Sequence, residues 1–137
     1  MKSSAELEHL AALQVAGLMA AAARTAPKTR GIDNIQVLAI EDAPTRDRLV
    51  TKMRELAKSE NRPNFERDAK CVAAVPVVVL IGVEAKPAGI NCGYCGRTRC
   101  EEITSANGVC AFNSIDLGIA SSSAVSVAAD ARVDTRL

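Results

Sequence analysis

The hydrophobic positions of the chain form two kinds of pattern, one helical and one typical of strands. From Ser4 to about Arg24 the residues are strong helix formers without proline, and apolar residues recur near helical spacing. These residues are Leu7, Leu10, Leu13, Gly17, Ala20 and Ala21. The later half of this predicted helix is apolar almost all round, so we expect other elements or a second subunit to cover it.

Two short apolar runs, residues 36–41 and 75–83, have the pattern of buried strands. Between them Pro44 marks a helix start, and an amphipathic pattern predicts a helix over residues 45–59. The polar residues 61–70 give no clear pattern. The order helix, strand, helix, strand predicts a parallel pair of strands with a right-handed crossover, which is the unit of α/β folds.

The apolar spacing near the carboxyl end predicts a last helix over about residues 114–131, with Asn113 as its N-cap. Two strands cannot form a stable open sheet alone, so the sheet is incomplete. A partner chain could add strands, residues 132–137 could form a third strand, or the natural protein could continue past Leu137. We favour truncation or strand exchange, and we expect one α/β domain over residues 1–137, a small parallel sheet flanked by helices.

Composition narrows the classes of partner. Lys and Arg number 17 against 16 Asp and Glu, so no net charge draws the protein to phosphate backbones or anionic lipid. Aromatic residues make up 2% of the chain, too few for the stacking platforms of single-strand binders. Glu6, Glu8 and His9 stand where a secretory signal carries positive charge, and the apolar stretch is too short to span a bilayer. We expect a cytoplasmic protein that binds neither nucleic acid nor membrane.

Four of the five cysteines fall within residues 89–112, in the spacing C-x2-C-x4-C-x9-C. A C-x2-C pair lets one tight turn direct two sulfurs at a common centre, and Gly93 and Gly96 permit the backbone angles of such a turn. Glycine also exposes amide groups that can donate to sulfur. The pattern predicts one four-thiolate metal site, with the ligands Cys92, Cys95, Cys100 and Cys110.

The residues between the cysteines predict how this site is built. Thr98 and Glu101 have the spacing of a capping box, which predicts a short helix from Thr98 with Cys100 in its first turn. The positive end of that helix favours thiolate over thiol. Arg97 and Arg99 could offset the negative charge of a thiolate-ligated cluster, or they could be ordinary solvated charges.

An iron-sulfur cluster is the interpretation that we favour for this site, and three alternatives stay open. Zinc ribbons generally have two separated C-x2-C knuckles, whereas this chain has one. Disulfides fit poorly with an odd number of cysteines and no secretory signal, and four unrelated thiols would not explain the clustering. The fifth cysteine, Cys71, precedes the second predicted strand, and we expect it in the core rather than as a further ligand or redox partner.

Residues 80–96, 108–111 and 116–124 carry a resemblance to a known family. They resemble the uncharacterised prokaryotic family called ferredoxin-domain-containing proteins, and the resemblance covers nearly the whole chain. The block C-x2-C-G-x3-C is also similar to a module of corrinoid and carbon-monoxide pathway proteins that binds a [4Fe-4S] cluster. The resemblance implies a [4Fe-4S] cluster on the four clustered cysteines, and it implies members that run longer at the carboxyl end.

A weaker likeness, in residues 21–27 and the last predicted helix, is to the flavin-binding nitroreductase fold. It implies a nitroreductase-like scaffold, a homodimer, and FMN whose phosphate Arg24, Lys28 and Arg30 would hold. The chain departs from that pattern, because the arginine-rich start of nitroreductases is missing and no terminal strand follows Leu137. Basic residues that complement the end of the first helix are the simpler interpretation.

These observations together lead us to expect one-electron transfer between a [4Fe-4S] cluster and a redox partner protein. Because protein sulfur fills all four positions, electron transfer is favoured over substrate activation, which needs an open iron. The alternatives are a flavin-dependent oxidoreductase fed by the cluster and a zinc-stabilised interaction module. The only histidine lies far in sequence from the cysteines, and neither a phosphate-binding loop nor a dinucleotide glycine fingerprint is present. Whether the chain is an enzyme stays open.

Overall fold

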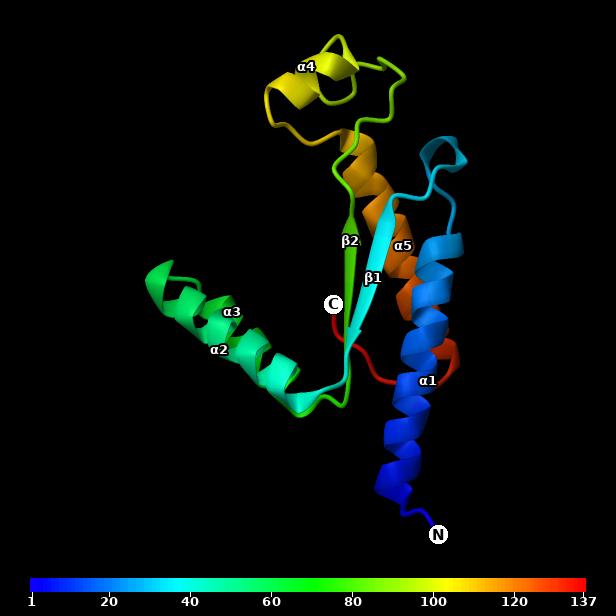
Figure 1. Ribbon diagram of the computed structural model, residues 1–137, viewed down its shortest axis with the longest axis vertical. Coiled ribbons are helices and arrows are strands. Elements are labelled where there is room, and N and C mark those ends of the chain that lie inside the picture. Colours follow the sequence, from blue (N-terminus) through cyan, green and yellow to red (C-terminus); the bar gives the residue numbers. More distant parts are fainter. The chain divides into compact units, whose positions relative to one another are not determined.

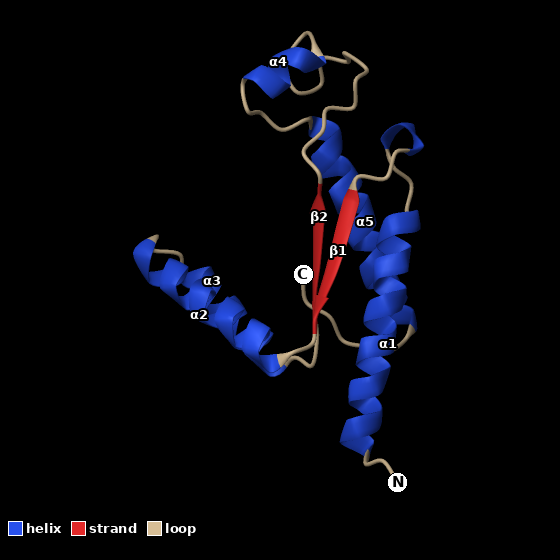
Figure 2. Ribbon diagram, in the orientation of Figure 1, coloured by secondary structure: helices blue, strands red, loops and turns tan.

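The computed structural model describes all residues from 1 to 137, and helices make up most of it (Figure 1). Two strands form its sheet, as the colouring by secondary structure shows (Figure 2). In chain order the elements are α1 (Ser4–Thr25), the 3-10 turn η1 (Thr29–Gly31), β1 (Ile35–Ile40), α2 (Ala43–Ser59), α3 (Pro63–Ala74), β2 (Val78–Val83), α4 (Cys100–Ser105) and α5 (Ala111–Asp130). None of the helices combines the length and the apolarity that crossing a bilayer requires.

The chain divides into two compact units, and each is described by itself. Unit 1 consists of residues 1–16 and 39–80, and unit 2 consists of residues 17–38 and 81–137. All the predicted metal ligands belong to unit 2. The prediction of one domain over the whole chain stays a prediction.

The two strands run antiparallel, so the predicted parallel pair is wrong. The Glu84 N–H, just after β2, donates to the Asn34 carbonyl, just before β1, at 2.9 Å, which pairs the end of one strand with the start of the other. The arrows in Figure 1 point in opposite directions. The difference is caused by α3, which lies largely on the polar residues 61–70 that gave no clear pattern. One connecting helix between two strands leads to a parallel strand. Two connecting helices return the chain to the edge of the sheet where the first strand ended, so the next strand runs antiparallel.

In unit 1, α2 and α3 form an antiparallel helical hairpin (Figure 1). The Asp42 carboxylate caps α2 by accepting from the Thr45 N–H at 2.8 Å, so the helix starts at the place that the sequence predicts. At the same end of the hairpin, Arg46 donates to the Val75 carbonyl at 2.8 Å. Cys71 is half-buried within α3 and does not lie at the entry to a strand, because β2 begins only at Val78.

In unit 2, α5 packs beside the later half of α1, and the Ser123 hydroxyl donates to the Ala22 carbonyl at 3.1 Å. Over the later part of α5 the buried residues are alanines at intervals of four, Ala120, Ala124 and Ala128, each with no exposed surface. Small side chains let two helix backbones approach closely. The buried residues of α1 are Val15, Ala16, Met19 and Ala23, whereas Leu7 and Leu10, which the sequence pattern placed on the inner side, are exposed.

The carboxyl-terminal residues do not form the third strand that was one of the alternatives. After α5 ends, Arg132 adopts a left-handed conformation with φ of 59°, and the Val133 N–H donates back to the Ala128 carbonyl at 2.9 Å. This is the hydrogen-bond pattern that closes helix ends, so the chain turns away from the helix here. No strand follows in residues 132–137.

Candidate metal centre

The four clustered cysteines line one pocket, which lies wholly within residues 87–112 of unit 2. Cys92 and Cys95 lie in the loop after β2, Cys100 is the first residue of α4, and Cys110 is the N-cap of α5. Figure 1 shows this loop and α4 at the end of β2, next to the start of α5. Three separate pieces of backbone therefore bring the predicted ligands to the same hollow.

A pair of hydrogen bonds between Asn91 and Cys100 closes the loop. The Cys100 N–H donates to the Asn91 side-chain oxygen at 2.8 Å, and the Asn91 N–H donates to the Cys100 sulfur at 3.4 Å. Asn91 adopts φ of 47°, in the left-handed region that asparagine tolerates better than most residues. Because Asn91 directly precedes Cys92, these bonds connect the first and third cysteines of the motif. Sequence reasoning missed this residue, although its place beside a cysteine was a signal.

The C-x2-C turn has the backbone that its glycines predict. Gly93 and Gly96 have φ of 73° and 80°, a region that side chains rarely adopt, and the Gly96 N–H donates to the Gly93 carbonyl at 2.9 Å. The Tyr94 N–H donates to the Cys92 sulfur at 3.5 Å. Amide donors directed at sulfur stabilise negative charge on it, so this turn both shapes the pocket and prepares it for thiolates.

Helix starts hold the other two cysteines, but not through the predicted caps. The capping box of Thr98 and Glu101 is wrong: α4 begins after Arg99, whose side chain makes no capping bond, and Glu101 pairs with Arg99 instead. The Asn91 side chain satisfies the first N–H of α4 in its place. Cys100 is in the first turn, as predicted, where unpaired N–H groups favour a thiolate.

The start of α5 differs from the prediction in the same way. Cys110, not Asn113, is its N-cap, and its side chain is almost completely buried. Asn113 lies in the first turn, where it is buried and donates to the Lys86 carbonyl at 3.0 Å. This bond joins α5 to the segment that leads from β2 into the cysteine loop. Asn113 therefore fixes the position of the loop rather than capping the helix.

Among Cys, His, Asp and Glu, only cysteine lines the pocket. None of the five cysteines forms a disulfide. No three Cys, His, Asp or Glu side chains lie close enough together to hold one metal ion. Zinc needs four sulfurs at about 2.3 Å from one point. A [4Fe-4S] cluster is likewise held by four cysteine thiolates, so the type of side chain around the pocket fits either group.

The two arginines of the loop have different surroundings. The Arg99 side chain forms an ion pair with Glu101 at 3.0 Å, and the hydrogen bond and charge of Glu101 raise the pKa of Arg99. The same contact lowers the pKa of the Glu101 carboxyl. Arg97 lines the pocket and makes no ion pair. One loop cation is thus balanced by an acid, and the other is not.

An aromatic pair adds to the wall of the pocket. The Tyr94 ring packs against Phe112 with ring centroids 6.0 Å apart, so the C-x2-C turn contacts the first turn of α5. Phe112 lines the pocket and is half-buried, whereas Tyr94 is largely exposed. Both belong to the few aromatic residues of the chain.

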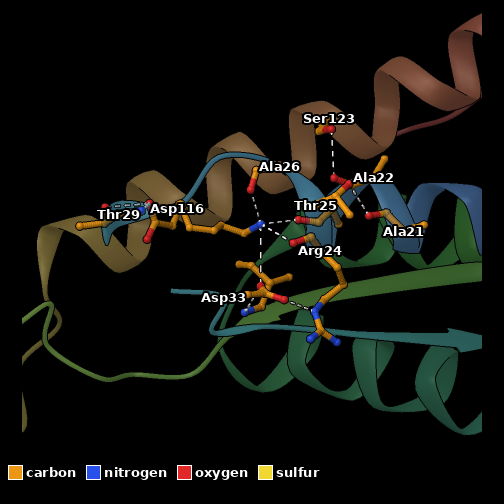
Figure 3. Close-up of polar contacts among 12 residues, drawn as sticks. Ala21, Ala22, Arg24, Thr25, Ala26, Thr29, Asp33, Asp116 and Ser123 are labelled. Atoms are coloured by element: carbon orange, nitrogen blue, oxygen red, sulfur yellow. Dashed lines mark hydrogen bonds and ion pairs between the residues drawn. The ribbon is translucent and has the colours of Figure 1, made fainter. Parts of the chain in front are cut away.

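The three basic residues suggested as a flavin phosphate site contact protein groups instead. The buried Lys28 amine donates to the carbonyls of Ala23 and Ala26 at 2.7 Å and of Arg24 at 3.0 Å, so its three hydrogens are used at the end of α1. Arg24 pairs with Asp33 (Figure 3), and Arg30 donates to the Ala88 carbonyl at 2.9 Å. The simpler interpretation therefore fits Lys28, which complements the end of the first helix, whereas Arg30 contacts the segment after β2.

Asp33 and Asp116 organise the turn beside these basic residues, and sequence reasoning singled out neither. Burial favours a higher pKa of Asp33, but bonds from Arg24 and the Ile35 N–H and the nearby charges hold its pKa below the ordinary value. The buried Asp116 carboxylate accepts from the N–H and hydroxyl of Thr29 at 3.0 and 2.9 Å (Figure 3). For Asp116, the signal available in the sequence was an acidic residue in the first turns of an otherwise apolar helix.

Comparison with known proteins places the chain in a family. Residues 106–137 match the family model described as "uncharacterized protein containing a ferredoxin domain". A protein of Archaeoglobus fulgidus, described as "uncharacterized protein", is 38% identical over 129 residues, which cover 88% of this chain and 69% of that protein. No solved structure matches the chain, so the nitroreductase-like scaffold stays a prediction. The identity and coverage show that the chain belongs to the same family as this archaeal protein, the uncharacterized proteins containing a ferredoxin domain (DUF2148).

Proposed function

We propose that this protein binds a [4Fe-4S] cluster through Cys92, Cys95, Cys100 and Cys110 and takes part in one-electron transfer. The observation that carries the proposal is that these four cysteines, from three segments of backbone, line one pocket. The ferredoxin domain named in the family description agrees with it. Such a cluster supplies reversible one-electron chemistry, whose potential depends on hydrogen bonds to sulfur and on solvent exposure.

The chain supplies what a thiolate-ligated cluster needs around it. Two backbone N–H groups, of Asn91 and Tyr94, already donate to cysteine sulfurs. Cys100, which accepts one of these bonds, and Cys110 lie at helix starts, where the helix dipole favours negative charge. These contacts stabilise thiolates and bias the bound group toward the reduced, more negative state.

Electron transfer is favoured over substrate activation because four protein sulfurs leave no open iron position. The pocket is open enough for close approach, since Cys92 is exposed and Tyr94 beside it is largely exposed. A short path from such a rim suits exchange with a redox partner protein. Five cysteines without a disulfide suit a reducing compartment, for which we propose the cytoplasm.

Metal and sulfide analysis of protein purified without oxygen tests the proposal. We expect about four irons and four sulfides per chain, as a [4Fe-4S] cluster requires, and a broad brown absorption that dithionite bleaches. Colourless protein with one zinc would replace the proposal by the zinc-stabilised interaction module. A sharp flavin spectrum would support the alternative of a flavin-dependent oxidoreductase, which no contact in the structure favours. Gel filtration of the same sample tests the predicted homodimer.

A further inference from the structure

Arg97 is the one charged side chain among the residues that line the cysteine pocket. It lies two residues after Cys95, on the turn that the two positive-φ glycines create, and it is exposed. It makes neither a hydrogen bond nor an ion pair. Arg97 is therefore a cation at the wall of the pocket without an acid to balance it.

Arg99 provides a contrast within the same loop. It carries the same charge two residues further on, but it does not line the pocket, and Glu101 holds it at 3.0 Å. Both arginines are exposed, so the difference between them is Glu101, whose opposite charge weakens the field of Arg99 at the sulfurs. The two arginines could not be distinguished in the sequence, and the structure separates them.

Reduction of the group bound in the cysteine pocket adds one negative charge to a site that is already surrounded by thiolates. A cation at the wall stabilises the reduced state more than the oxidised state, because the more negative state interacts with it more strongly. Of the other charged residues at this end of the unit, Lys86 pairs with Glu84 at 2.8 Å and Glu102 carries the opposite sign. Arg30 donates to the Ala88 carbonyl at 2.9 Å and does not itself line the pocket.

We infer that Arg97 sets the reduction potential of the group bound in the cysteine pocket, as a positioning residue that favours the reduced state, whereas Arg99 does not. The inference rests on the proposed function, since it concerns the same site. The redox step is the uptake of one electron from an external reductant, with no bond formed or broken and no proton required.

A potentiometric titration with dithionite compares wild-type protein with Arg97→Gln, Arg97→Lys and Arg99→Gln. At a fixed applied potential, Arg97→Gln should reduce the ratio of reduced to oxidised protein about threefold, or roughly 30 mV at 59 mV per tenfold change for a one-electron couple. Arg97→Lys keeps the charge and should keep the wild-type potential. Arg99→Gln removes the same net charge and should shift the ratio much less than Arg97→Gln.

Iron and sulfide content, measured on every variant, separates this inference from the function on which it rests. Wild-type protein with four irons but equal potentials in all variants would overturn the role of Arg97 and leave the proposed function intact. Equal shifts in Arg97→Gln and Arg99→Gln would show a general charge effect and also overturn it. Wild-type protein without iron would overturn both. Loss of iron in Arg97→Gln alone would mean that the arginine holds the site together, which contradicts a role in tuning.

Discussion

The hydrogen bonds of Asn91 make it the residue whose replacement tests most directly how the pocket is assembled. Its side chain satisfies the first N–H of α4 at 2.8 Å, and its backbone occupies the left-handed region at φ of 47°. Asn91→Gly keeps that backbone and removes only the side-chain acceptor. Asn91→Ala removes the acceptor and adds the strain of a side chain in the left-handed region. Asn91→Asp keeps an acceptor oxygen in the same place.

The expected costs follow from these two contributions. Losing the hydrogen bond to the Cys100 N–H costs about 0.5 to 1.5 kcal/mol of local stability in Asn91→Gly. The left-handed conformation adds roughly 1 to 2 kcal/mol in Asn91→Ala. Each kcal/mol corresponds to about a fivefold change in the population of locally open chain. Asn91→Asp should stay close to wild type in this contact.

Amide hydrogen exchange of Cys100, followed by nuclear magnetic resonance on reduced protein, measures that population. Exchange should be about fivefold faster in Asn91→Gly and faster again in Asn91→Ala, with Asn91→Asp near wild type. Exchange within α2, in the other unit, serves as the internal control and should not change. Unaltered exchange of Cys100 in Asn91→Gly would refute the reasoning, because the side chain would then contribute nothing to the start of α4.

Three further changes test the scaffold. A hydrogen bond from the Thr45 N–H lowers the pKa of Asp42 in the folded chain. Asp42 therefore stabilises α2 above the unfolded pKa of about 3.9, and this stabilisation is lost as the pH falls through the lower folded pKa. Circular dichroism in urea should show this loss in wild-type protein but not in Asp42→Asn. Asp116→Ala leaves the N–H and the hydroxyl of Thr29 unpaired near the buried start of α5 and should cost about 1 to 3 kcal/mol in urea unfolding. Equal stability of Asp116→Ala and Asp116→Asn would contradict the role of Asp116 as the acceptor of these two bonds. Ala124→Leu should cost about 1 to 3 kcal/mol by overpacking, and the matched change at exposed Ala129 should cost little; similar losses would show that Ala124 is not packed as described.

The local elements with strong periodicity could be predicted from the sequence. The first helix, predicted over residues 4–24, is observed over Ser4–Thr25, and the helix after Pro44 ends at Ser59 as expected. Apolar spacing and a proline near the helix start are local signals, and they are enough for such elements. The side of α1 that is buried did not follow from the same pattern, because leucines near its start are exposed while smaller residues further on are covered.

Both strands were predicted, but their relative direction was wrong because one helix was missed. In α3, Phe65, Ala69 and Val72 have helical spacing after Pro63, but charged residues surround them and conceal the pattern. That one omission changed the strand direction, since direction depends on how many helices lie between two strands. A weak local signal thus decided a feature of the whole fold.

The predicted ligand set came from the sequence, whereas the contacts that hold it did not. Spacing and glycines predicted that the cysteines share a site, and the structure places all four around one pocket. The predicted capping box is absent, and the Asn91 side chain, nine residues before Cys100, accepts from the first N–H of α4 instead. Hydrogen bonds between residues distant in sequence, such as those of Asn91 and Asn113, depend on tertiary structure that no short motif specifies.

Iron and sulfide content of two single cysteine variants, purified side by side without oxygen, tests the central claim most directly. Cys95 lines the pocket, whereas the half-buried Cys71 lies in α3 of the other unit and serves as the matched control. Cys95→Ser should lose most of its iron and sulfide together with the brown absorption, and Cys71→Ser should keep the content of wild type. Equal iron in both variants, or none in wild type, would contradict the claim that these four cysteines hold an iron-sulfur cluster.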